Sequence, residues 1–196
     1  MVTCELLIAR HGQTEWNRLM RWQGGSNIPL NVVGIRQAQE LGKSMLDKGI
    51  EHIYSSDLSR AKQTADIVAQ VLGISDVRTD DRLRERYLGR FEGWYTEDVA
   101  RFAGIPLDTA HTLENDVLGL EKLPGVEPFS SFTERIWEKL NEIPEEIGSG
   151  KCLVVAHGAV MRAISFSADR SGNPRLTFEN TEILQLAHND GSWQVV

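Results

Sequence analysis

Residues 5–12, Glu5-Leu6-Leu7-Ile8-Ala9-Arg10-His11-Gly12, form an apolar run that ends on an arginine, a histidine and a glycine. Residues 152–158 repeat this pattern, because Cys152-Leu153-Val154-Val155-Ala156 runs into His157-Gly158. Strands of an open α/β sheet are buried along their length, and such sheets bind ligands at the carboxyl ends of their strands. Two neighbouring strands that end in this way would bring both imidazoles into one crevice.

The rest of the chain alternates predicted strands and helices. Asn31 is predicted to cap a helix that ends at Gly49, and Ser55-Ser56-Asp57 to cap a second helix after a short strand at 52–54. The apolar positions of the two helices recur at helical spacing: Ile35, Ala38, Leu41, Met45 and Leu46 in the first, Leu58, Ala61, Ala65, Val68 and Leu72 in the second. This alternation predicts a parallel sheet.

Residues 83–130 interrupt the alternation and are predicted to form a cap over the site. An amphipathic helix is expected from about Ser131, a further helix over 159–168, and a hairpin of 183–186 and 193–196 around the turn at 189–191. The predicted fold class is therefore α/β. It is a three-layer sandwich with a mostly parallel central sheet, a small helical and loop cap at about 94–130, and a C-terminal hairpin.

Composition narrows the class of protein. The length of 196 residues and the hydrophobic fraction of 41% fit one domain over 1–196. The formal net charge of −7 disfavours binding of nucleic acid, which is itself negatively charged. No apolar stretch reaches the roughly 18 residues of a membrane span, and no leader precedes the first strand, so a cytoplasmic protein is expected. Cys4 and Cys152 are interpreted as small buried hydrophobes in a reducing compartment.

The strand ends gather residues that could bind a tetrahedral dianion. Arg10 and His11 close the first strand, and His157 precedes Gly158 at the start of a helix, whose N–H groups favour an anion. Arg60 lies in the first turn of its helix and is expected at the same edge of the sheet. Arginine suits such a site because it keeps its charge and donates two parallel hydrogen bonds. Glu85, in the loop after the third strand, is a candidate proton donor.

Other chemistries lack their sequence patterns. The five histidines show no His-x-x-x-His pair and the two cysteines no Cys-x-x-Cys, so no zinc-ligand spacing is present and no metal or cofactor is expected. There is no Gly-x-x-x-x-Gly-Lys-Ser/Thr, which argues against a P-loop nucleotide site.

Taken in order, these residues resemble the histidine phosphatase superfamily, also called the phosphoglycerate mutase-like family. The resemblance covers essentially the whole chain. It rests on Arg10-His11-Gly12-Gln13-Thr14-Glu15-Trp16-Asn17, Gln23-Gly24, Pro29-Leu30, Gly34, Gln37-Ala38, Ser55-Ser56-Asp57-Leu58-Ser59-Arg60-Ala61, Thr64-Ala65, Leu83-Arg84-Glu85, Gly89, Glu92-Gly93 and Val155-Ala156-His157-Gly158. One departure is Gly125-Val126-Glu127-Pro128, where many members carry Gly-Gly-Glu-Ser.

The resemblance implies a phosphoglycerate mutase-like fold and a role for each matching residue. His11 would be the nucleophile that becomes phosphohistidine, and Glu85 the general acid and base. Arg10, Arg60 and His157 would hold the phosphoryl group, with Asn17 and Gln23 assisting. Gly24 and Gly158 adjoin these residues and are included among the candidate phosphate-binding positions.

The short stretch between Gly93 and Pro124 resembles the compact phosphatase branch rather than the longer glycolytic mutases. The expected activity is a metal-independent phosphomonoesterase acting on small phosphorylated metabolites. A phosphoglycerate mutase is the alternative, and a non-catalytic phosphate-binding module is disfavoured by the intact nucleophile and proton donor. Specificity is expected from the cap, with Trp94, Tyr95 and Phe102 as candidates. No nucleic acid or membrane partner is expected, and a homodimer is left open.

Overall fold

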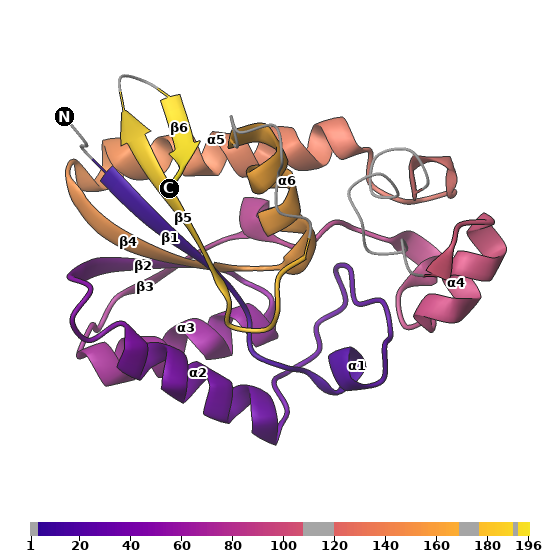
Figure 1. The fold of residues 1–196 in the computed structure, drawn as a ribbon, viewed down its shortest axis with the longest axis horizontal. Coiled ribbons are helices and arrows are strands. Elements are labelled where there is room, and N and C mark those ends of the chain that lie inside the picture. Colours follow the sequence, from indigo (N-terminus) through magenta and orange to yellow (C-terminus); the bar gives the residue numbers. More distant parts are fainter. Residues whose placement is uncertain (1–3, 108–119, 169–176, 190–191) are drawn as a thin grey trace.

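The computed structural model describes residues 4–107, 120–168, 177–189 and 192–196. One six-stranded sheet runs through it in the order β3-β2-β4-β1-β5-β6 (Figure 1). The strands are β1 (Cys4–Arg10), β2 (Ile50–Ser56), β3 (Val77–Asp80), β4 (Gly150–Ala156), β5 (Ile183–Asn189) and β6 (Ser192–Val195). The first four are parallel, whereas β5 runs antiparallel to β1 and pairs with β6 as a hairpin at one edge.

Helices cover both faces of this sheet. The helices are α1 (Glu15–Arg18), α2 (Val32–Ser44), α3 (Ser59–Leu72), α4 (Thr96–Ala103), α5 (Phe129–Ile147) and α6 (Gly158–Ala168), with short 3₁₀ turns at Asp81–Leu83, Gly89–Phe91 and Leu120–Lys122. Figure 1 shows α2 and α3 on one face and α5 and α6 on the other. The predicted three-layer α/β fold with a mostly parallel sheet and a C-terminal hairpin is confirmed.

The central strand β4 shows why the two helical layers form. Its side chains alternate between the faces of the sheet, so Leu153 and Val155 pack with the core under α2 and α3. Cys152 and Val154 pack instead with the core under α5 and α6. A strand that is apolar on both faces is stable only when helices cover both, as the sequence of residues 152–156 predicts. Cys4 and Cys152 are free and buried, as expected.

Two predicted helix boundaries are wrong, and one is confirmed. The Asn31 side chain accepts a hydrogen bond from Gly34 N and caps α2 as predicted. The helix ends at Ser44, five residues before Gly49, and Leu46 beyond it is exposed. The cap of α3 is Leu58 without a side-chain hydrogen bond, because Ser55 and Ser56 belong to the buried end of β2.

The predicted cap is described in part, since residues 108–119 of it lie outside the described residues. Its helix α4 lies beyond the carboxyl ends of the parallel strands (Figure 1). Described cap residues build a small core of their own with residues from the preceding loops: Trp22, Leu88, Phe91, Val99, Leu120, Leu123 and Val126. The start of α5 also differs from the sequence prediction, because the helix begins at Phe129 with Pro128 as its N-cap.

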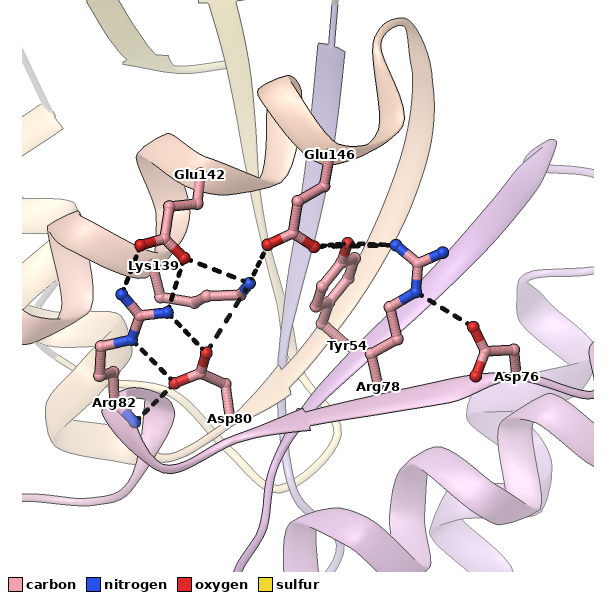
Figure 2. Close-up of polar contacts among 8 residues, drawn as sticks. All are labelled: Tyr54, Asp76, Arg78, Asp80, Arg82, Lys139, Glu142 and Glu146. Atoms are coloured by element: carbon pink, nitrogen blue, oxygen red, sulfur yellow. Dashed lines mark hydrogen bonds and ion pairs between the residues drawn. The ribbon is translucent and has the colours of Figure 1, made fainter.

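A polar network joins α5 to the sheet edge formed by β2 and β3. Figure 2 shows Lys139 of α5 between three carboxylates, with Glu146 at 2.5 Å, Glu142 at 3.5 Å and Asp80 at 3.7 Å from its Nζ atom. The network continues through Tyr54, Asp76, Arg78 and Arg82. Along the described residues, no helix is long and apolar enough to cross a membrane.

Candidate active site

The two strand-end histidines lie side by side. β1 and β4 are neighbours, and Arg10 lies opposite Ala156. His11 and His157, which follow these two residues, therefore lie at the same level of the sheet. The main-chain N–H of His11 donates to the Ala156 carbonyl at 3.0 Å. The two rings are edge to face with their centroids 5.2 Å apart, and both are buried. The expectation that both imidazoles share one crevice is confirmed.

Two contacts select one tautomer of His11. Its Nδ1 atom lies 2.7 Å from the Gly12 carbonyl oxygen, an acceptor, so Nδ1 carries the proton. Nε2 accepts a hydrogen bond from Arg60 Nε at 3.2 Å and therefore carries a lone pair. Burial, then the charges of Arg60 and Arg10, hold the pKa of His11 well below its usual 6.5.

His157 is a buried ring whose polar atoms are not hydrogen-bonded. Neither of its ring nitrogens has a hydrogen-bond partner in the described structure, and its side chain is 0% exposed. Burial, with the nearby Arg60, lowers its pKa well below 6.5. The buried Nε of Arg10 is likewise without a partner there. A polar ligand at this edge of the sheet would supply hydrogen-bond partners for these groups.

Arg60 is fully buried and donates in three directions. Besides Nε to His11, its Nη1 donates to the Ser26 carbonyl at 2.7 Å and its Nη2 to the Gly24 carbonyl at 2.8 Å. Burial lowers its pKa to about 10, which still leaves the guanidinium charged at neutral pH. Arg60 therefore fixes the loop at 24–26 against His11, and the prediction that the first turn of this helix reaches the sheet edge is correct.

Arg10 reaches across the site from the end of β1. Its Nη1 donates to the Phe178 carbonyl at 2.6 Å. Burial and the neighbouring charge of Arg162 lower its pKa, while Glu85 acts in the opposite direction. Gly158 lies against this guanidinium, because a Cβ at that position would come within 3.6 Å of Arg10 Nε.

Glu85 lies at the N-terminus of α6. Its Oε2 accepts from the Ala159 main-chain N–H at 3.1 Å, and its Oε1 from the Arg86 N–H at 2.9 Å. The anion that this helix end binds in the structure is therefore the carboxylate of Glu85 itself. The backbone that carries Glu85 is held by Arg135, which donates to the Arg82, Arg84 and Glu85 carbonyls.

Glu127 also supports the segment that carries Glu85. It belongs to residues 125–128, where the sequence departs from the Gly-Gly-Glu-Ser pattern. Arg135 forms a bidentate ion pair with Glu127, at 2.7 and 2.9 Å. Glu127 also accepts from the Tyr87 N–H at 3.0 Å. Pro128 has no hydroxyl that could cap α5. The Glu121 carboxylate caps the helix instead, by accepting a hydrogen bond from the Phe129 N–H at 2.6 Å.

The loop after β1 carries Asn17, Gln23 and Gly24 to the same edge. Thr14 orients the first two, since its main-chain N–H donates to Asn17 Oδ1 and its hydroxyl to Gln23 Oε1. Gly24 has a positive φ of 50°, in the left-handed region that favours glycine. Gly12 allows a close approach of two backbone segments, because a Cβ there would meet the Gly34 carbonyl oxygen at 2.5 Å.

A cavity of about 110 Å³, here called the first cavity, lies in front of these residues. Its lining residues include Arg10 and Arg60 but neither His11 nor His157. A second cavity of about 340 Å³ adjoins it and shares Arg10, Asn17, Arg21 and Arg162 with it. The first cavity is lined by Arg10, Asn17, Arg21, Trp22, Gln23, Gly24, Arg60, Glu85, Arg86, Leu88, Leu120, Gly158, Ala159 and Arg162.

Several residues that line the cavities were not among the candidates predicted from the sequence. Arg162 follows Gly158 by four residues, which is one helical turn, and that spacing was the available signal. Arg21 lies two positions before Gln23, and Arg86 directly follows Glu85. The cap residues Trp94, Tyr95 and Phe102, expected to set specificity, line a separate hollow, and none of them lines either cavity.

Metal ligands do not gather in the part of the chain that the structure describes. No three side chains of His, Cys, Asp or Glu come together there in a group that could hold an ion. Independence from metal stays a prediction, which chelation tests.

The fold and this cluster define an α/β protein with buried histidines and arginines at the carboxyl edge of its sheet, and comparison with known proteins gives the family. A sequence model of the Histidine phosphatase superfamily (branch 1) matches residues 6–196. The Bacillus subtilis protein named "Uncharacterized phosphatase PhoE" is 33% identical over 169 residues, covering 86% of this chain and 79% of that protein. The chain belongs to the histidine phosphatase superfamily.

Similar solved structures include proteins named for both kinds of activity. A phosphoglycerate mutase from Bacillus anthracis superposes with a TM-score of 0.89 at 27% identity, covering 100% of this chain and 92% of the other. A mycobacterial glucosyl-3-phosphoglycerate phosphatase in complex with VO3 superposes with a TM-score of 0.81 at 26% identity, covering 98% and 96%. The chain is thus an enzyme of this superfamily, similar to phosphatases and to mutases.

Proposed function

We propose that this chain hydrolyses phosphomonoesters of small metabolites through a phosphohistidine at His11. The observation that carries the proposal is the state of that ring. The Gly12 carbonyl fixes the proton on Nδ1, and burial beside two arginines keeps the ring neutral, so Nε2 has a lone pair for attack on phosphorus.

The groups around His11 match the charge of a transferring phosphoryl group. Its three equatorial oxygens carry most of the negative charge in the transition state, and preorganised cations stabilise that charge. Arg10 Nε and the His157 ring nitrogens are buried without partners in the described structure, so phosphoryl oxygens would supply an acceptor for Arg10 Nε and for the one ring nitrogen of neutral His157 that carries a proton. Asn17, Gln23, Gly24 and Gly158 are among the residues that line the first cavity.

Glu85 is assigned the proton transfers. In the first step the His11 Nε2–P bond forms, the P–O bond to the alcohol breaks, and Glu85 donates a proton to the leaving oxygen. In the second step Glu85 takes a proton from water, whose oxygen attacks phosphorus and releases His11 and inorganic phosphate. The Arg86 and Ala159 N–H groups hold the carboxylate in one orientation for both transfers.

A phosphoglycerate mutase is the second candidate, favoured by the TM-score of 0.89 with the Bacillus anthracis enzyme. A mutase uses the same phosphohistidine but returns the phosphoryl group to a substrate before water takes it. Similarity to the Bacillus subtilis protein named as a phosphatase, and to the mycobacterial phosphatase bound to VO3, supports hydrolysis. Release of phosphate compared with mutase flux in the presence of 2,3-bisphosphoglycerate separates the two.

The test of the proposal is an assay of phosphate release from a panel of phosphorylated metabolites, with EDTA present, for the wild type and His11→Ala. We expect hydrolysis that survives chelation, an acid-labile phosphoenzyme in the wild type, and a loss of at least about a thousandfold in His11→Ala. A His11→Ala variant with a tenth of the wild-type rate, or activity that needs an added divalent metal, would overturn the proposal.

A further inference from the structure

Thr64 is a buried hydroxyl close to His11 that the proposed chemistry does not use. It lies on α3, four residues after Arg60, and is 0% exposed. Its Oγ1 atom accepts a hydrogen bond from the Gly12 main-chain N–H at 3.0 Å and donates one to the Arg60 carbonyl at 2.7 Å. A hydroxyl has one proton and two lone pairs, so it can form both bonds at once. Thr64 lines neither cavity, so it can act on a ligand only through other residues.

The bond to Gly12 is the unusual one of the two. Threonine hydroxyls within helices often donate to the carbonyl four residues earlier, as Thr133 of α5 does toward Phe129 at 3.0 Å. The bond from the Gly12 N–H instead joins residues 52 positions apart and reaches the residue that follows His11. Gly12 is buried, so without this acceptor a buried N–H would lose its hydrogen bond.

Asn180 holds the same peptide group from its other side. Its Nδ2 atom donates to the His11 carbonyl at 2.9 Å, and this carbonyl and the Gly12 N–H belong to one planar peptide. In a trans peptide the two groups point in opposite directions, so Thr64 and Asn180 bind its opposite sides. Hydrogen bonds at both ends of a rigid plane restrict its rotation. The peptide that follows His11 is therefore fixed by two side chains, one from α3 and one from the segment before β5.

The backbone next to Asn180 is strained. Thr181 adopts a positive φ of 63°, in the left-handed region that a β-branched residue rarely enters. Its N–H donates to the Arg10 carbonyl at 3.0 Å, which keeps this turn beside the end of β1. Strain of this kind clusters at functional sites, and here it adjoins the residue that binds the His11 carbonyl.

The orientation of this peptide reaches the imidazole ring through Gly12. The Gly12 carbonyl, one peptide further along, is the group that accepts the proton of His11 Nδ1 at 2.7 Å. The other ring nitrogen, Nε2, accepts from Arg60, whose main-chain carbonyl is bonded to the same Thr64 hydroxyl. One hydroxyl thus connects the two residues that contact the two ring nitrogens. A tilt of the peptide would move the Gly12 carbonyl away from Nδ1 and change the direction in which Nε2 points.

We propose that Thr64 and Asn180 are positioning residues for the nucleophile: by holding the peptide between His11 and Gly12, they keep the proton on Nδ1 and point Nε2 at the bound phosphoryl group. The inference rests on the proposed function in that His11 is the nucleophile. A displacement of about 1 Å at a reacting group can cost about a hundredfold in rate. The role of Thr64 should therefore appear in the rate of phosphoryl transfer rather than in substrate binding.

Thr64→Val tests this role, because valine keeps the shape of threonine and removes the hydroxyl. We expect kcat and the single-turnover rate of phosphohistidine formation to fall by about tenfold or more, while KM changes by less than about threefold. Thr64→Ser restores the hydroxyl and should keep both rates within about threefold of the wild type. Thr133→Val is the matched control, since the Thr133 hydroxyl bonds only to carbonyls of its own helix, and it should leave kcat unchanged.

A spectroscopic measurement on the free protein does not depend on turnover. The ¹⁵N resonances of the His11 ring report which of its nitrogens carries the proton. We expect the Nδ1–H form in the wild type and in Thr64→Ser, and a detectable share of the Nε2–H form in Thr64→Val. This separates the two possible failures. A wild type that hydrolyses none of the phosphorylated metabolites would refute the proposed function, whereas the tautomer of His11 would still show whether Thr64 positions the ring.

The double variant Thr64→Val with Asn180→Ala tests whether the two residues act on one peptide. Asn180 also lines the second cavity, so the informative quantity is the coupling between the two changes. We expect Asn180→Ala to slow Thr64→Val much less than it slows the wild type, because the peptide is already released.

Losses that multiply in the double variant would overturn the shared role. So would a Thr64→Val variant with the wild-type kcat, an equal loss in Thr64→Ser, a loss that lies in KM, or an unchanged tautomer of His11. Should Thr64→Val fail to fold, Thr64→Ala and Thr64→Ser give the same comparison, since both lack the methyl group and differ only in the hydroxyl.

Discussion

Arg60 Nε donates to His11 Nε2 at 3.2 Å, and this is the same nitrogen that is proposed to attack phosphorus. The contact fixes the lone pair of the nucleophile in the free protein. An incoming phosphoryl group must take the place of the Arg60 N–H on this lone pair. Because both Nη atoms of Arg60 are anchored on the Ser26 and Gly24 carbonyls, the guanidinium stays in place, and the Nε–H that leaves His11 would then be available to a phosphoryl oxygen.

Removing this guanidinium should weaken transition-state binding. Arg60→Ala is expected to lower kcat/KM and to weaken competitive inhibition by vanadate, each by roughly 2 kcal/mol or more, since a buried charge-assisted contact is lost. Arg10→Ala should act in the same direction. Lys62→Ala, an exposed position on the same helix, serves as control. Unchanged kinetics in Arg60→Ala would show that Arg60 only anchors the loop.

Glu85→Gln should discriminate between leaving groups. Alkyl phosphates leave as strongly basic alkoxides and should lose about a hundredfold or more in the variant, the scale of general-acid catalysis. p-Nitrophenyl phosphate leaves as a weakly basic phenolate and should lose much less in phosphohistidine formation. Single-turnover measurements test this, and equal losses for the two substrates would remove Glu85 from the general-acid role.

Arg135 should act on the reaction through Glu85. It donates to three carbonyls of the segment that carries Glu85, so Arg135→Met is expected to lower kcat more for alkyl phosphates than for p-nitrophenyl phosphate. The double variant with Glu85→Gln should be no slower than Glu85→Gln alone, because the two residues would act as one unit. Additive losses would mean that Arg135 works independently of Glu85.

The buried histidines should make the folded state sensitive to acid. Unfolded, each imidazole has a pKa near 6.5, whereas in the folded protein burial and nearby arginines hold it well below that. Between these values the unfolded chain binds more protons, so stability falls as the pH drops below about 6.5, by up to about 1.4 kcal/mol per histidine and pH unit. Urea unfolding of the wild type and His157→Gln between pH 7.5 and 5 measures this. An equal slope in the variant would contradict it.

The Lys139 network should stabilise the fold without touching the chemistry. Lys139→Met leaves Asp80, Glu142 and Glu146 without their shared cation, and we expect a loss of about 2 kcal/mol in the free energy of unfolding. Lys62→Met, which breaks an exposed pair with Asp66, should cost no more than about 0.5 kcal/mol. Losses of equal size would show that burial of Lys139 adds nothing.

The sequence by itself determined the sheet and the residues at its edge. The apolar runs 5–9 and 152–156 are buried on both faces, so they predict parallel strands under two helical layers, and the residues that end them must lie at the carboxyl edge. This local rule brought His11 and His157 together. It missed the C-terminal end of α2 and the cap of α3, because serine hydroxyls and apolar residues near helix ends fit more than one local structure.

The tertiary structure alone decided what each side chain does at that edge. No local pattern states that Glu85 is bound by the N-terminus of α6, that Arg60 donates to His11, or that Arg21 and Arg162 line the same two cavities. These contacts join residues far apart in the chain, and their partners depend on how the cap and loops pack. The periodicity of a sequence encodes which face of an element is buried, whereas the direction of a polar side chain depends on the partners that folding brings to it.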